Sequence, residues 1–173
     1  FVEVGISEQD MASIAAGKTK DVEKAVKLRE GDLHDLVLPL VAEDPAGIAD
    51  AKKLAAVFPA AEKAGVTKLL DELAAQTNEQ RKAFVFAYGA VRGLERKAGE
   101  ATWPPEDRTS ELAEAGRRTA AAASAYLSSR VFLTECATDL ESSFGPRRDA
   151  LEKAKAAFEA VGDRRREATA MAL

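Results

Sequence analysis

The sequence predicts an all-α protein, an elongated antiparallel helical bundle of three to four long helices with a small cap of short helices at one end. Alanine occurs 36 times and glutamate 18 times among 173 residues, and both favour helix strongly. Uncharged residues recur at steps of three and four over long stretches. Proline and glycine fall mostly between these stretches, which indicates turns.

Residues 8–42 form the first expected helix. Ser7 and Asp10 resemble a capping box, and apolar residues then recur at helical spacing. These are Met11, Ile14, Val22, Val26, Leu33, Leu36 and Leu40. A break near residues 17–19 stays open, and we expect Pro39 to kink or end the helix because proline clashes with the preceding turn.

Residues 43–66 are expected to form the cap as one or two short helices. Asp44 followed by Pro45 is a helix-start signal. Ile48, Ala51, Ala55 and Phe58 then make a short apolar stripe. Pro59 interrupts it, and Gly65 is expected to close a second short piece. One continuous helix is the alternative, but two prolines and two glycines argue against it.

Residues 67–99 are expected to form the second long helix, with Thr67 as its N-cap. Its uncharged positions are Leu70, Leu73, Thr77, Phe84, Ala87, Val91, Leu94 and Ala98. Gln80 falls on the same face and breaks its apolar character. The Trp103-Pro104-Pro105 sequence requires a turn, and we expect Trp103 to plug the end of the bundle.

The clearest pattern runs through residues 110–140, which we expect to form one continuous helix within residues 110–143. Nine uncharged positions keep one face for four heptads, which is typical of a helix packed along its whole length. They are Leu112, Ala115, Thr119, Ala122, Tyr126, Ser129, Leu133, Cys136 and Leu140. Charged residues, Arg130 among them, fall elsewhere. Cys136 is therefore expected to be buried and unreactive.

Phe144-Gly145-Pro146 marks a turn before a last, shorter helix that carries Leu151, Ala154, Phe158, Val161 and Ala168. Residues 8–42, 67–99 and 110–143 have matched lengths of 33 to 35 residues, about 50 Å each. Such helices pack antiparallel into a rod. We therefore expect residues 1–173 to be a single helical-bundle domain with both termini at one end.

Composition and motifs argue against catalysis. The net charge is −4, the pI is about 5.2, and charges of both signs are interleaved, so nucleic acid is not an expected partner. His34 and Cys136 are the only histidine and cysteine, too few for a metal site or a nucleophile–base pair. We expect no enzyme activity, no cofactor and no metal. His34 is expected at the surface beside Glu30.

A cysteine-poor, Glu/Ala-rich chain of long helices with a small cap resembles the glutamic acid/alanine-rich surface proteins of trypanosomes. Their architecture is similar to the helical N-terminal domains of variant surface glycoproteins and to the trypanosome haptoglobin–haemoglobin receptor. The resemblance implies a GPI-anchored coat protein on the extracellular side of the parasite plasma membrane. Phe1 is not a natural initiator, so we expect a processed or trimmed fragment whose anchor signal lies beyond Leu173.

In this interpretation only the lipid anchor contacts the membrane, since the longest apolar run, residues 36–42, is too short to span it. The cap would lie farthest from the membrane and would contact an unidentified protein or host ligand. The candidate surface residues there are Asp44, Asp50, Lys52, Lys53, Arg147 and Arg148. The alternative is an intracellular, bacterial or phage scaffold or adaptor that docks a partner protein in a groove between helices.

Overall fold

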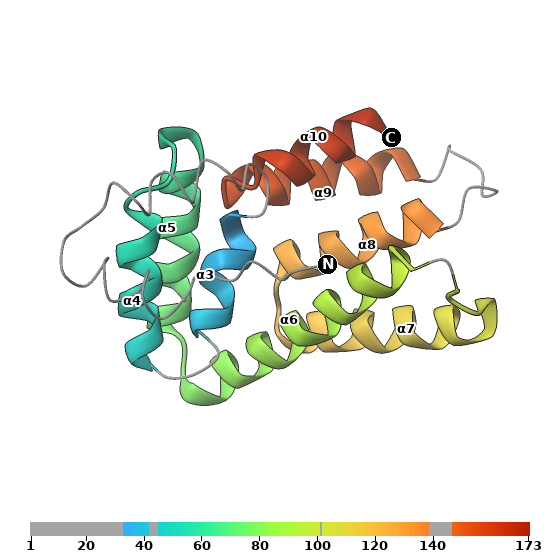
Figure 1. The fold of residues 1–173 in the computed structure, drawn as a ribbon, viewed down its shortest axis with the longest axis horizontal. Helices are drawn as coiled ribbons and strands as arrows, with labels where there is room; N and C mark the ends of the chain where they lie inside the picture. The colour runs from blue at the N-terminus through green and yellow to red at the C-terminus, as the bar shows by residue number, and fades with distance from the viewer. Residues whose placement is uncertain (1–32, 42–44, 101, 139–146) are drawn as a thin grey trace. The chain divides into compact units, whose positions relative to one another are not determined.

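The computed structural model describes residues 33–41, 45–100, 102–138 and 147–173, which form eight α-helices and no strand. The predicted all-α class is therefore confirmed. Helices keep the labels of Figure 1. Backbone contacts divide the chain into two compact units, unit 1 (Phe1–Ala75 with Val161–Arg165) and unit 2 (Gln76–Ala160 with Arg166–Leu173). We describe each unit by itself, and the single domain over residues 1–173 stays a prediction.

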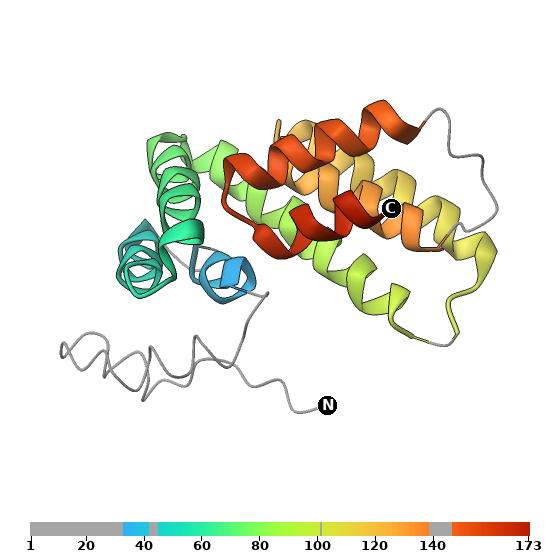
Figure 2. The same ribbon diagram turned by 90° about the horizontal axis from the view of Figure 1, so that it is seen from above.

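Unit 1 contains α3 (Leu33–Val41), α4 (Pro45–Ala55) and α5 (Ala60–Ala75), which lie side by side in Figures 1 and 2. Helix α4 begins at Pro45, as predicted, since proline fits the first helical position. The predicted stripe of Ile48, Ala51, Ala55 and Phe58 is buried. It packs in a core with Leu36, Val37, Leu38, Leu54, Val66, Leu70 and Leu73.

A turn far along the chain completes unit 1. Residues 161–163 approach the start of α5 so closely that a Cβ at Gly65 would lie 2.2 Å from the Val161 carbonyl carbon. Gly162 has φ +70°, a left-handed conformation that favours glycine, and its added Cβ would lie 2.7 Å from the Glu62 carbonyl oxygen. The prediction that Gly65 ends a short helix is therefore wrong, because α5 continues through it. Gly65 permits backbone-to-backbone packing inside α5.

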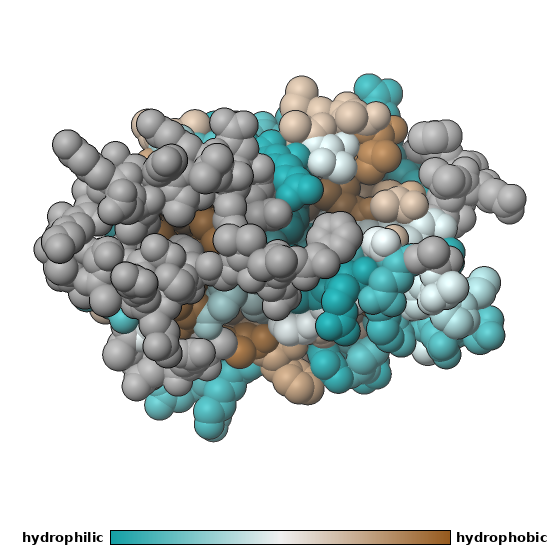
Figure 3. Space-filling view, in the orientation of Figure 1, coloured by the Kyte–Doolittle hydropathy of each residue, from teal (hydrophilic) through white to brown (hydrophobic). Residues whose placement is uncertain are grey.

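Unit 2 contains α6 (Asn78–Ala98), α7 (Pro105–Ala121), α8 (Ala125–Thr138), α9 (Arg148–Ala160) and all but the first two residues of α10 (Arg164–Ala172). Successive helices run antiparallel, and α6, α7 and α8 pack against one another (Figures 1 and 2). Tyr126 and Phe158 meet edge to face with ring centroids 6.0 Å apart. Figure 3 shows hydrophilic and apolar residues interspersed over the part of this unit that faces the viewer.

The prediction of one helix through residues 110–143 is wrong. Residues 105–138 form the α7–α8 hairpin instead, with a turn at residues 122–124. Ala123 adopts φ +48°, its N–H donates to Ala120 O at 2.9 Å, and the Ser124 N–H donates to Thr119 O at 3.3 Å. These two bonds form a Schellman motif, which normally uses glycine at the left-handed position. The Ser124 hydroxyl then accepts from the Leu127 N–H at 3.2 Å and starts α8.

Most of the uncharged face is buried despite this break, whereas Leu112 and Ala122 are half-buried and Leu140 lies outside the described residues. Ala115, Thr119, Tyr126, Leu133 and Cys136 are all at most 8 % exposed. The predicted burial of Cys136 is confirmed. An uncharged stripe thus identifies the buried residues without showing whether the helix continues between them.

The second long helix is also divided. Thr67 lies inside α5, and the helical conformation is interrupted at residues 76–77. Thr77 is the N-cap of α6: its hydroxyl accepts from the Gln80 N–H at 3.2 Å, while Gln80 Oε1 accepts from the Thr77 N–H at 2.9 Å. Gln80, which seemed to spoil an apolar face, is therefore half of a capping box. The end of this helix at Gly99 is confirmed.

The predicted lengths of the helices at residues 67–99 and 110–143 are wrong as well, because the longest helix among the described residues is α6, with 21 residues. Helix α3 ends two residues after Pro39, as expected of proline in a last turn. Trp103 is buried, and its indole N–H donates to Glu111 Oε2 at 3.1 Å. The rest of the predicted helix 8–42 and the turn at residues 144–146 lie outside the described residues.

Candidate functional site

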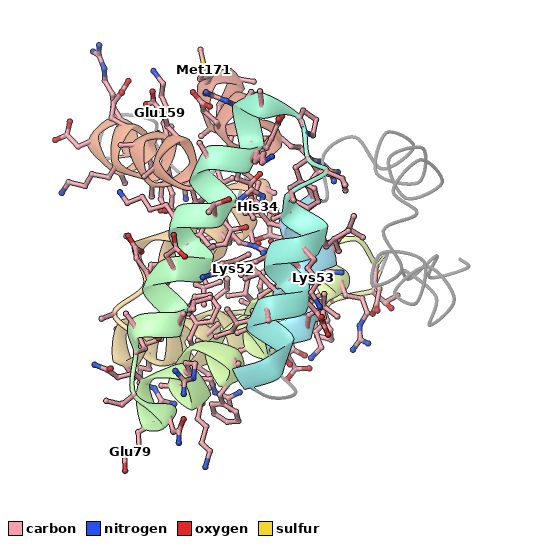
Figure 4. The ribbon with its side chains drawn as sticks, turned by 90° about the vertical axis from the view of Figure 1, so that its left-hand side faces the viewer. His34, Lys52, Lys53, Glu79, Glu159 and Met171 are labelled. Atoms are coloured by element: carbon pink, nitrogen blue, oxygen red, sulfur yellow. The ribbon has the colours of Figure 1, made fainter. Side chains whose placement is uncertain are left out.

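The residues predicted as a cap surface fall in both units. Lys52 and Lys53 lie on α4 (Figure 4) and are already paired. Lys53 Nζ is 2.9 Å from Asp50 Oδ1, and Lys52 Nζ is 2.6 Å from Asp71 Oδ1 on α5. Arg147 and Arg148 lie at the start of α9 in unit 2, and Asp44 lies outside the described residues. A common surface formed by these residues stays a prediction.

His34 is buried within unit 1, so its predicted place at the surface is wrong. It is 2 % exposed and lies among the helices in Figure 4. Its Nε2 is 2.7 Å from Val161 O and donates to that carbonyl, while Nδ1 is 4.0 Å from the buried Asp163 carboxylate. The predicted partner Glu30 lies outside the described residues. Helical spacing to Val37 and Leu38 was the available signal of burial.

The His34–Asp163 pair is structural in character. Both side chains are at most 3 % exposed, so a substrate has no access to either group. The pair instead attaches the 161–163 turn to α3. Within the described ranges no group of three or more histidine, cysteine, aspartate or glutamate residues is arranged to hold a metal ion.

A second buried polar cluster holds unit 2 together. Arg130 was expected among the outward charges, yet it is 0 % exposed. Its Nε and Nη2 donate to the two Glu95 carboxylate oxygens at 2.8 and 2.5 Å. The Arg130 guanidinium carbon also lies 5.5 Å from the ring centroid of Tyr88 and 5.6 Å from that of Tyr126. Both distances are just within the range of a cation–π interaction, about 6 Å. Sequence spacing gave no signal of this contact, because Glu95 and Arg130 are 35 residues apart.

Among the described residues of unit 2, a groove between α7 and α8 is the candidate for a binding site. Its volume is about 520 Å³, and it opens to solvent. Leu112, Ala113, Gly116 and Val131 form an apolar centre, and the polar edge comes from Arg108, Thr109, Glu135 and Thr138. An added Cβ at Gly116 would meet no atom within 4 Å, so the centre is open. Grooves between the helices of a bundle are common binding sites.

The groove lining carries one positive and one negative side chain, Arg108 and Glu135. The Arg108 Nη1 and Nη2 groups donate to Thr138 O and Trp103 O, each at 3.0 Å, so the guanidinium is engaged by backbone carbonyls. Glu135 is exposed, and no described residue forms an ion pair with its carboxylate. The groove therefore combines apolar contact surface with an acidic group at its edge, which suits a partner that is apolar on one side and basic beside it.

In comparisons with known proteins, no family model, no curated protein and no solved structure matches the chain. No described helix combines the length and apolar character needed to cross a membrane.

Proposed function

We propose that this chain is a non-enzymatic helical interaction protein of the scaffold or adaptor class, which binds an amphipathic helix of a partner protein in the α7–α8 groove. The observation that carries the proposal is the open, apolar centre of that groove with Glu135 at its edge. An amphipathic helix places apolar side chains at steps of three and four, so it would cover Leu112 and Ala113, beneath which Val131 is buried. A lysine or arginine beside that face would meet Glu135.

The test uses a defined probe, an acetylated 18-residue amphipathic peptide of leucine and lysine labelled with a fluorophore. We expect saturable one-to-one binding, with a Kd below about 100 μM, measured by fluorescence anisotropy. Gly116→Leu fills the groove from α7 and should weaken binding at least tenfold, without loss of helicity. Ala121→Leu, at an exposed α7 position outside the groove, is the matched control and should bind like the wild type.

Glu135→Gln should weaken binding about two- to fivefold and reduce its salt dependence, the size expected for an exposed ion pair. Absence of binding to the wild-type chain at 100 μM peptide would contradict the proposal. Equal binding by the wild type and by Gly116→Leu would place the peptide elsewhere and would contradict it as well.

We propose as a second candidate the GPI-anchored surface coat protein implied by the trypanosome resemblance. The high content of alanine and glutamate and the all-helical described residues support it. It requires an elongated antiparallel bundle with a membrane-distal cap carrying Asp50, Lys52 and Lys53. Surface biotinylation of cells that express the full-length protein, followed by phosphatidylinositol-specific phospholipase C, should release labelled protein. Label that stays with the cells after this treatment, or failure to label, would exclude this candidate.

A further inference from the structure

The outer face of α6 carries an arrangement that packing within unit 2 does not explain. The inner face of this helix contributes Phe84, Ala87, Val91 and Leu94 to the core. The opposite face, one residue every three or four positions, consists of Lys82, Phe86, Gly89, Gly93, Arg96 and the flanking Glu100. Arg96 Nε lies 3.9 Å from Glu100 Oε1, so both side chains are on this side of the chain. We call these six residues the outer α6 face.

Phe86 is 61 % exposed, although aromatic side chains usually bury a large area. The Arg118 guanidinium lies 4.0 Å from its ring centroid, so one side of the ring is covered and the rest faces solvent. An added Cβ at Gly89 or Gly93 would meet no atom within 4 Å. Glycine lowers helix stability relative to alanine, and here no neighbouring group among the described residues requires it.

We propose that the outer α6 face is the interface of an antiparallel homodimer, in which residue i faces residue 182 − i of a second copy. In this register Gly89 faces Gly93 of the second copy, so the two helix backbones approach closely. Phe86 faces Arg96, which provides a cation–π contact for the open side of the ring. Lys82 faces Glu100, which pairs opposite charges at both ends of the contact.

Two-fold symmetry makes the register self-complementary, because each of these three contacts occurs twice. The occupant is a second copy of this chain because the face carries the acidic group and the basic group that its own symmetry mate requires. A single helix pair buries less than a standard interface of about 1,200–2,000 Å². We therefore expect a weak dimer, with a Kd on the order of 10–100 μM. This inference is independent of the groove in the proposed function.

The charge register is tested by sedimentation velocity over about 5–500 μM protein. The wild type should shift from monomer to dimer across this range. Lys82→Glu and Glu100→Lys should each remain monomeric, because each homodimer would contain two like-charge pairs. An equimolar mixture of these two variants should form a heterodimer, since both of its pairs again have opposite charge. A mixture that stays monomeric, or single variants that dimerise like the wild type, would overturn the proposed register.

The close approach is tested separately with Gly89→Leu/Gly93→Leu. Both positions are open within one chain, so this variant should keep its helicity. The Kd of its dimer should rise at least tenfold. Ala121→Leu, at an exposed α7 position outside both the groove and the outer α6 face, is the control and should dimerise normally. A wild type that is monomeric at 500 μM would exclude the proposal. That result would leave the groove assay unaffected.

Discussion

The strongest stability prediction concerns the buried guanidinium of Arg130. This side chain is fully buried, whereas its partner Glu95 is 20 % exposed. The Glu95 carboxylate also lies 3.4 Å from Arg166 Nη2 and 3.4 Å from Arg92 Nη1. Glu95→Gln keeps the size of the side chain, but it replaces one of the two acceptor oxygens with an NH2 donor and removes the charge that balances these arginines. We expect this substitution to destabilise the folded chain strongly.

The magnitude follows from the cost of leaving a buried charge without its counterion. Removing one member of a buried ion pair costs about 3–5 kcal/mol. Because solvent reaches part of Glu95 and the glutamine oxygen still accepts a hydrogen bond, we expect a loss near the lower limit, about 3 kcal/mol. For a chain of this size that corresponds to a decrease in Tm of about 6–12 °C.

Urea unfolding followed by circular dichroism at 222 nm measures the loss. Combining Glu95→Gln with Arg130→Met removes both charges, and we expect it to recover at least half of the lost stability, because an apolar replacement of a buried pair is often neutral. Glu72→Gln is the control: its 4.0 Å contact with Lys68 is exposed, so it should change the free energy of unfolding by less than about 0.5 kcal/mol. A Glu95→Gln variant as stable as the wild type would refute the argument.

Three further changes test the local packing, each by the same unfolding measurement. Gly65→Ala should lower the free energy of unfolding by about 1–3 kcal/mol because its Cβ would collide with the backbone of the 161–163 turn. Gly93→Ala lies in open space and should raise the free energy of unfolding by about 0.5–1 kcal/mol. Equal effects of the two substitutions would disprove the close approach at Gly65. Ala123→Gly should stabilise by about 1 kcal/mol, since glycine adopts the observed positive φ without strain; a destabilised variant would contradict the assigned turn. His34→Leu should lower the free energy of unfolding by about 1–3 kcal/mol, because it leaves the buried Val161 carbonyl without its hydrogen-bond donor. An unchanged urea midpoint would show that this contact is dispensable.

Local signals in the sequence predicted several elements correctly. Helix α4 begins at Pro45, α6 ends at Gly99, and Cys136 is buried. Each of these depends on residues close together in the chain, such as a proline at a helix start or an uncharged position on a helical stripe. Interactions of this range are encoded by neighbouring side chains, so they can be inferred before the fold is known.

Helix boundaries inside alanine-rich stretches could not be inferred in this way. Residues 120–123 are all alanine, which favours helix continuation, yet the chain reverses direction there. The left-handed Ala123 costs about 1–2 kcal/mol, and the burial of apolar residues on both arms of the α7–α8 hairpin must compensate for this. Propensity gives no warning of such a turn because the compensating contacts lie between residues far apart along the chain.

The sequence by itself determined that this protein is helical and which uncharged faces its helices bury, because propensity and periodicity act over a few residues. Only the tertiary structure decided that His34 and Arg130 are buried, that Gly65 accommodates a passing backbone, and that α7 and α8 enclose a groove. Each of these features needs a partner from a distant part of the chain, and a polar side chain is buried only where folding supplies that partner.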